Sequence, residues 1–246
     1  MWDRPDLLNS AASALYGLGA LLALVAVIAF TLSLPVFPLR EIQLESAPVH
    51  VTRDEIERRM KGAIRGNFFT LDLESVRTSF MAIPWVRNVE LRRHWPGRLQ
   101  VALEEHVPLA RWAPAALINT HGEVFEARYT GALPVFAGPE GAAKEMAIQY
   151  EFFRRGLSLI GHQPAELLVS PRRAWRLKLE SGITLELGRE HIEARFNRFV
   201  ATYESTLQTL DQAVQYVDLR YANGFAVRVP SAPARGPERG HGRGTG

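Results

Sequence analysis

Hydrophobic positions divide the chain into an apolar N-terminal segment and a longer part with regular patterns. Every residue from Leu7 to Leu39 is uncharged, and residues 14–34 are almost entirely apolar. A helix of about 20 apolar residues rising 1.5 Å each matches the hydrocarbon core of a bilayer, and Pro35 and Pro38 favour its end. We therefore expect one transmembrane helix at residues 14–35, preceded by a short tail at residues 1–13.

Two alternatives for this segment are less favoured. A buried helix of a water-soluble protein would have to be apolar on all faces, and a cleaved signal peptide has a shorter apolar region, a basic start and an A-x-A-like site. The flanks carry Asp3, Arg4 and Asp6 before the segment and Arg40 and Glu41 after it. Neither flank has a clear excess of basic residues, so the charge pattern does not decide which end of the helix faces the cytoplasm.

In residues 38–108, the spacing of apolar residues is typical of a strand in some segments and of a helix in others. Thr52 and Glu55 form a T-x-x-E capping box that predicts a helix, and a second helix is expected at residues 72–81. Alternating apolar positions predict strands around Ile42, around Val89 and over residues 99–103, with a turn at residues 95–97 between the last two. The predicted order is strand, helix, helix, strand, strand, with Trp85 and Trp95 between sheet and helices.

Residues 109–230 predict a mixed sheet with two covering helices. Helical spacing is found at residues 142–157 and 192–203, and alternation at residues 175–179 and 183–187. Near the end, residues 216–221 and 225–229 flank Asn223-Gly224, a dipeptide that favours a tight type I′ hairpin. The fold class expected for the whole chain is α+β.

Charge and cysteine content exclude several function classes. The chain has 29 basic and 26 acidic residues. The Gly/Arg-rich stretch at 231–246, which we expect to be disordered, holds three of the arginines and one of the glutamates. Residues 1–230 therefore carry 26 basic and 25 acidic side chains. Such a balance argues against a nucleic-acid partner. With no cysteine, disulfides, thiolate metal sites and cysteine nucleophiles are excluded.

No catalytic pattern stands out. The seven histidines show no metal-binding spacing, and His121-Gly122-Glu123 lacks the cysteines that a zinc deaminase element requires. The serine at 158 lacks the spacing of a nucleophile elbow, and Glu104 and Glu105 point to opposite faces of a strand. We therefore expect no enzyme activity, no cofactor, no metal and no small-molecule substrate.

The strand, helix and turn pattern also carries a resemblance to a known family. Residues 84–112, which contain Pro84-Trp85, Trp95-Pro96 and a closing V-P-L-A-R-W, resemble the POTRA domain of the bacterial cell-division family FtsQ/DivIB. The resemblance extends through Gly122-Glu123-Val124-Phe125, Leu187-Gly188-Arg189 and residues 217–221 of the second block. It implies a POTRA domain at 38–108 and a C-terminal β domain at 109–230.

The resemblance implies a non-catalytic scaffold of the divisome, the protein assembly of the division septum. The chain would be a single-pass type II protein of the inner membrane, with its C-terminal domains in the periplasm. It would bind FtsB and FtsL through the β domain and depend on FtsK for recruitment, with the POTRA domain involved. A POTRA-bearing translocation component and a membrane-anchored periplasmic enzyme are the alternatives.

An open sheet edge would let FtsB add a strand, because unpaired N–H and C=O groups there can bind an extended peptide. We expect this edge in the last hairpin, with Arg220 and Tyr221 as main anchors and Arg189 facing an acidic residue of the partner, as the resemblance implies. The alternative is that Tyr221 fills the core, Arg220 is solvated and Arg189 caps a helix. The full set of expected partner-binding residues is Arg189, Val217, Leu219, Arg220, Tyr221, Gly224, Phe225 and Val227.

Overall fold

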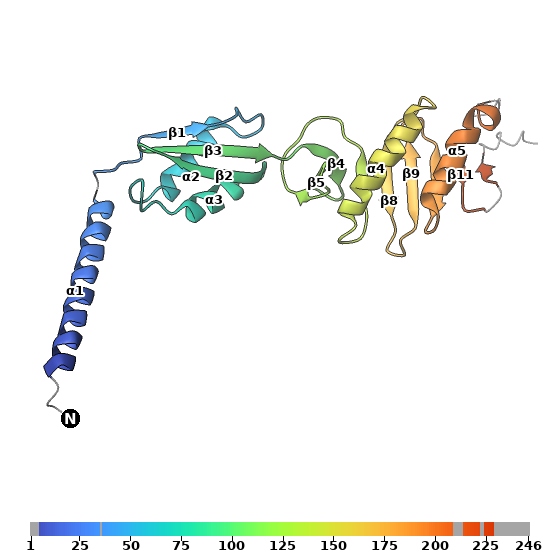
Figure 1. Cartoon of the computed structure of the whole chain (residues 1–246). Coiled ribbons are helices and arrows are strands. Elements are labelled where there is room, and N and C mark those ends of the chain that lie inside the picture. Colours follow the sequence, from blue (N-terminus) through green and yellow to red (C-terminus); the bar gives the residue numbers. More distant parts are fainter. Residues whose placement is uncertain (1–4, 35, 209–213, 222–223, 229–246) are drawn as a thin grey trace, which may run out of the picture. The chain divides into compact units, whose positions relative to one another are not determined.

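The computed structural model describes residues 5–34, 36–208, 214–221 and 224–228 (Figure 1). By its internal contacts the chain divides into two compact units, Met1–His106 and Val107–Gly246. This division falls close to the boundary expected at residues 108 and 109. The expected tail at residues 231–246 and Asn223 lie outside the described residues.

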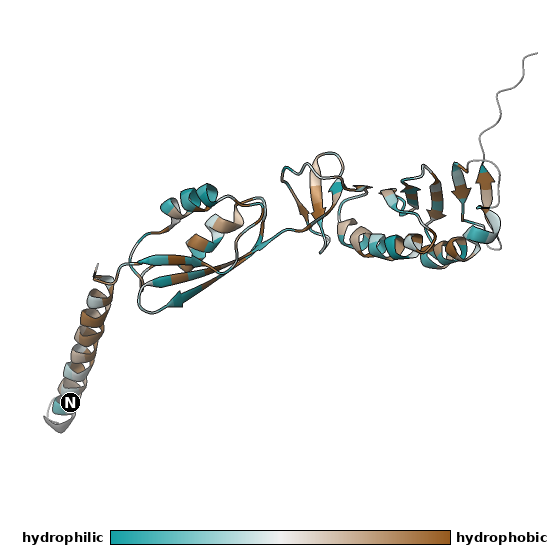
Figure 2. Ribbon diagram, turned by 90° about the horizontal axis from the view of Figure 1, so that it is seen from above, coloured by the Kyte–Doolittle hydropathy of each residue, from teal (hydrophilic) through white to brown (hydrophobic). Residues whose placement is uncertain are grey.

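The first unit begins with a long apolar helix. Helix α1 spans Pro5–Ser33, so it begins before the expected residue 14, and its segment Asn9–Ser33 is long and apolar enough to cross a membrane. Proline suits the first turn of a helix, where its missing N–H costs no hydrogen bond. Apolar residues line α1 along most of its length (Figure 2), and its large side chains are exposed, Leu22 by 60 %. Such a large exposed apolar surface is expected of a helix that lies in lipid rather than in water.

The rest of the first unit has the predicted order of strand, two helices and two strands. Its elements are β1 (Glu41–Leu44), α2 (Arg53–Ala63), α3 (Leu73–Met81), β2 (Val86–His94) and β3 (Arg98–Glu105). The sheet order is β1-β3-β2, with β1 parallel and β2 antiparallel to the central β3. Thr52 is the N-cap of α2, as the sequence predicted, because its hydroxyl accepts a bond from the Glu55 N–H at 3.4 Å. Asp72 caps α3 in the same way.

The two tryptophans of this unit differ in burial. Trp85 is half-buried and stacks on His50, with ring centroids 3.9 Å apart. Trp95, by contrast, is 62 % exposed, so the expectation that it packs between sheet and helices is wrong. The core between the sheet and α2 and α3 is aliphatic with Phe80, and Trp95 lies in the turn between β2 and β3, outside this core. The alternation of β3 places Leu99 and Val101 in that core instead.

The second unit is one mixed sheet covered on one face by two helices. Its strands are β4 (Pro108–Trp112), β5 (Ala116–Asn119), β6 (Val124–Phe125), β7 (Val135–Ala137), β8 (Pro164–Val169), β9 (Trp175–Leu179), β10 (Thr184–Gly188), β11 (Tyr216–Asp218) and β12 (Ala226–Arg228). They lie in the order β12-β11-β10-β9-β8-β7-β4-β5-β6. Helices α4 (Ala143–Ser158) and α5 (Ile192–Thr206) lie on the same face (Figures 1 and 2).

The helix-covered face holds the core of this unit, and the opposite face is polar. Phe153 of α4 and Phe196 of α5 are fully buried with ring centroids 4.9 Å apart. On the open face, Lys178 pairs with Glu166 across β9 and β8. One face of the sheet therefore packs against the helices. Unpaired backbone N–H and C=O groups are expected at the two outermost strands of the sheet.

Candidate partner-binding edge

Strand β12 forms one end of the large sheet. Its residues pair antiparallel with β11, Val217 opposite Val227, and β11 in turn pairs parallel with β10. Among the described residues, β12 has no strand on its outer side. Because β11 has neighbours on both sides, an added strand at this end of the sheet would have to pair with β12.

The connection between β11 and β12 is not the predicted tight turn. The strands end at Asp218 and resume at Ala226, so residues 219–225 separate them. The backbone there is engaged elsewhere: the Leu219 N–H donates to the Glu186 carbonyl at 2.9 Å, and Arg198 of α5 donates to the carbonyls of Leu219 at 3.3 Å and Tyr221 at 2.8 Å. Asparagine followed by glycine favours a tight turn only where such tertiary bonds do not compete.

The expected site residues differ in what they expose. Val217 and Leu219 are 0 % exposed and belong to the core, while Gly224, Phe225 and Val227 are half-buried. Tyr221 is 58 % exposed, which argues against its filling the core. Arg189 and Arg220 are also exposed. The exposed side chains available to a partner at this end of the sheet are therefore those of Arg220 and Tyr221, which follow β11, and of Arg189, which follows β10 two strands from β12.

Arg220 is held in place by its neighbour Asp218. Its Nε and Nη2 donate to the two oxygens of that carboxylate at 2.9 and 2.6 Å, and its backbone N–H donates to Oδ1 at 3.0 Å. The side-chain bond from Arg220 is the main reason that the pKa of Asp218 lies below its usual range, against the effect of burial. The fixed guanidinium keeps an exposed edge at the surface, which suits recognition of a second acceptor.

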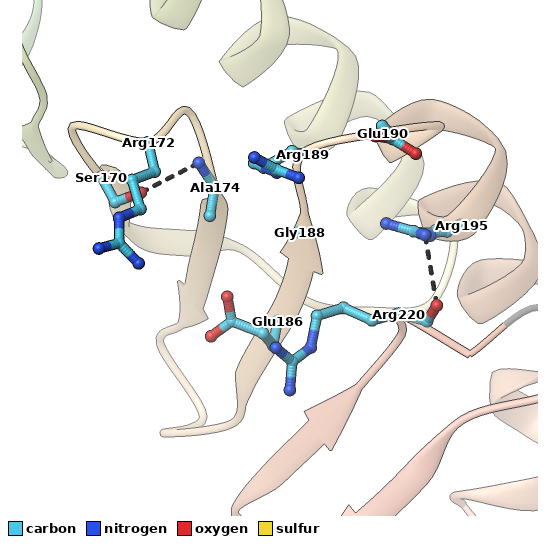
Figure 3. Close-up of a pocket in the computed structure, with 9 residues that line it drawn as sticks. All are labelled: Ser170, Arg172, Ala174, Glu186, Gly188, Arg189, Glu190, Arg195 and Arg220. Carbon is cyan, nitrogen blue, oxygen red and sulfur yellow. Dashed lines mark hydrogen bonds between the residues drawn. The ribbon is translucent and has the colours of Figure 1, made fainter.

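A hollow of about 500 Å³ opens beside this pair, at the end of β10 (Figure 3). Its lining residues come from the β8–β9 connection, β10, the segment before α5, α5 and the segment after β11: Ser170, Arg172, Ala174, Glu186, Gly188, Arg189, Glu190, Arg195 and Arg220. The lining contains four arginines and two glutamates, and one of these glutamates, Glu186, already pairs with Arg176 outside the lining at 2.8 Å. The hollow is therefore positively charged and fits an acidic group.

Gly188 lets the arginines come this close. Its φ is +78°, and a Cβ at this position would lie 2.9 Å from Arg195 Nη1 and 3.1 Å from Arg220 Cγ. Arg195 uses the space to donate to the Leu187 carbonyl at 2.7 Å and to the Arg220 carbonyl at 3.3 Å. Arg189, which follows Gly188 in the chain, pairs with no carboxylate among the described residues.

Sequence reasoning missed Arg172, Arg195 and Arg198. The last two are three residues apart on α5 and so share a helix face, a spacing that could have marked them as a pair directed at one target. No group of three or more His, Cys, Asp or Glu side chains that could hold a metal ion is found in the described part of the chain.

Comparison with known proteins identifies the family. Residues 37–106 match the family model "POTRA domain, FtsQ-type", and residues 110–220 match "Cell division protein FtsQ/DivIB, C-terminal". The chain is similar to proteins named "Cell division protein FtsQ" from Nitrosospira multiformis (41 % identity, covering 93 % of this chain and 99 % of that protein), Burkholderia pseudomallei (40 %; 93 % and 94 %) and Neisseria gonorrhoeae (31 %; 97 % and 98 %). The chain therefore belongs to the FtsQ/DivIB family of cell division proteins.

Proposed function

We propose that this chain is a non-catalytic scaffold of the divisome that binds FtsB, and through it FtsL, by strand addition at β12. The observation that carries the proposal is that an unpaired strand edge, β12, and a basic hollow at the end of β10, two strands away, lie at the same end of the sheet. The edge offers backbone hydrogen bonds to any extended segment, whereas Arg189, Arg220 and Tyr221 select a segment with an acidic and an apolar residue.

Arg189 is the arginine most available to an acidic partner residue. Arg220 already holds Asp218, and Arg195 already holds two carbonyls, so both would have to share their donors. Arg189 is exposed and lies in the wall of the same hollow (Figure 3). A carboxylate bound there exchanges water for a charge-assisted bond without breaking a bond of the free protein.

The placement in the cell is part of the proposal. Helix α1 anchors the chain in the inner membrane as a type II protein with its C-terminal domains in the periplasm at the septum. The proposed domains are the POTRA domain at 38–108, which takes part in FtsK-dependent recruitment, and the β domain at 109–230. An alkaline phosphatase fused after residue 230 should be active, and an inactive fusion there would reverse this topology.

Co-purification of FtsB with the full-length protein in detergent tests the partner site. The variants Arg189→Glu and Tyr221→Ala should each lose FtsB while their thermal unfolding stays unchanged, because both side chains are exposed. Arg154→Glu on α4 is the matched control, since Arg154 is also exposed and, among the residues that the structure describes, forms its ion pair with its helix neighbour Glu151. Full retention of FtsB by both edge variants would contradict the proposal.

A further inference from the structure

A loop of the POTRA domain is hydrogen-bonded to the end of α1. Asn67 Nδ2 donates to the carbonyls of Leu32 and Leu34 at 2.7 and 2.8 Å. Leu32 lies in the last turn of α1, whose carbonyls have no partner within the helix, and Leu34 directly follows the helix. The Asn67 side-chain oxygen accepts the backbone N–H groups of Phe69 and Thr70, each at 2.9 Å. Asn67 is only 5 % exposed, so one buried amide fixes the loop and the helix end together.

An aromatic face lies at this junction, formed by Phe37, Phe69 and Trp95. The Phe37 and Phe69 ring centroids are 5.2 Å apart, and each lies about 6 Å from that of Trp95 (6.1 and 6.0 Å). The buried Phe68 supports them from below and donates its N–H to the Phe37 carbonyl at 2.9 Å. Trp95 is 62 % exposed and Phe69 38 %, although the domain has a core of its own.

Chain length and the Asn67 bonds together keep this face near the end of α1. Phe37 is four residues beyond Ser33, the last residue of the helix, and four residues span at most about 14 Å. The polar regions of a bilayer add roughly 10 to 15 Å to the hydrocarbon core in total, or roughly 5 to 7.5 Å in each leaflet, so this upper limit is longer than one polar region. The bonds from Asn67 to the carbonyls of Leu32 and Leu34 shorten the distance, because they hold the loop that carries Phe69 against the end of α1 and so within reach of the interface.

We propose that the aromatic face inserts into the lipid headgroup region of the leaflet at which α1 ends, and so anchors the POTRA domain to the membrane surface; this rests on the proposed single span. Tryptophan is the side chain that most favours this region, because its ring is apolar and its N–H needs a polar partner. Arg40 lines the same small hollow as Phe37 and Trp95 and can reach lipid phosphates.

Single cysteines make the test direct, because the natural chain has none. The full-length protein is labelled with a polarity-sensitive fluorophore at Phe69→Cys or Trp95→Cys and placed as one copy per nanodisc of phosphatidylethanolamine and phosphatidylglycerol. Val49→Cys is the matched control: Val49 is 84 % exposed and lies beside Glu105, at the other end of β3, roughly 20 Å from the aromatic face. Val25→Cys, within α1, reports the span itself.

Quenching by brominated lipids decides the outcome. The labels at positions 69 and 95 should lose several-fold more fluorescence than the label at 49, and the label at 25 should lose the most. Labels at 69 and 95 that behave like the one at 49, with strong quenching at 25, overturn the anchor and leave the span intact. Weak quenching at 25 overturns the span and the anchor together. Labels shielded from iodide but not quenched by lipid indicate a protein contact and overturn the anchor.

Discussion

Arg198 of α5 should determine whether the partner-binding edge is formed. Its guanidinium donates to the carbonyls of Leu219 and Tyr221 and so holds the segment that positions β12. Hydrogen bonds to a charged group contribute about 1.5 to 3 kcal/mol each, but the bond to Leu219 is long at 3.3 Å, so Arg198→Ala should destabilise this segment locally by about 2 to 3 kcal/mol. We expect β12 to open more often without unfolding of the sheet.

Hydrogen exchange measured by mass spectrometry on the full-length protein tests this expectation. A cost of about 2 to 3 kcal/mol corresponds to a roughly 30- to 150-fold faster exchange in residues 216–228, while β8 and β9 keep their protection. Arg154→Ala on α4, which removes an arginine with no contact to this edge, should leave exchange unchanged. Unchanged exchange at residues 216–228 in Arg198→Ala would refute the reasoning.

Three further predictions follow from contacts in the two units. Trp85→Ala should lower the free energy of unfolding by about 1 to 3 kcal/mol in chemical denaturation, less than for a fully buried tryptophan, because Trp85 is half-buried against His50. Burial raises the pKa of Glu105, but bonds from the N–H groups of residues 49–51 outweigh it, so that its pKa is lowered. Glu105→Gln should therefore destabilise the protein at pH 7, and in melts the difference should begin to shrink near pH 4, the ordinary pKa of a glutamate, and disappear as the pH falls through the lowered pKa of Glu105. Gly188→Ala should weaken FtsB co-purification, because a Cβ at φ +78° displaces Arg220, and equal recovery of FtsB would contradict this role.

Local patterns predicted most of the elements because they act within a few residues. The Thr52 N-cap, the alternation of β3 and the helical spacing of α4 are each decided by near neighbours, and the structure has all three. Strand β8 was missed because its more exposed face also carries an apolar residue: Leu167 is buried, and Leu168, its neighbour on the other face, is a leucine that is 39 % exposed. Period-two alternation is weak in such a strand.

The site needed information that no local pattern contains. Asn223-Gly224 predicts a tight turn, but the pairing of Asp218 with Ala226 sets a longer connection, and Arg198, more than twenty residues earlier, bonds the carbonyls of Leu219 and Tyr221 within it. Val217 and Leu219 belong to the same short segment as Arg220, yet the sheet order puts them in the core. Trp95 was expected to pack between the sheet and the helices, but it lies in the turn between β2 and β3, outside the core.

Disulfide cross-linking between this chain and FtsB tests the central claim most directly. Single cysteines at Ala226 and Arg228 lie on the exposed positions of β12, and Val124→Cys on β6, at the opposite end of the sheet, is the control. Strand addition predicts that moving the cysteine from 226 to 228 shifts the cross-linked FtsB position by two residues, with no cross-link at 124. Cross-links to FtsB positions three or four residues apart, or none from either position of β12, would contradict the account.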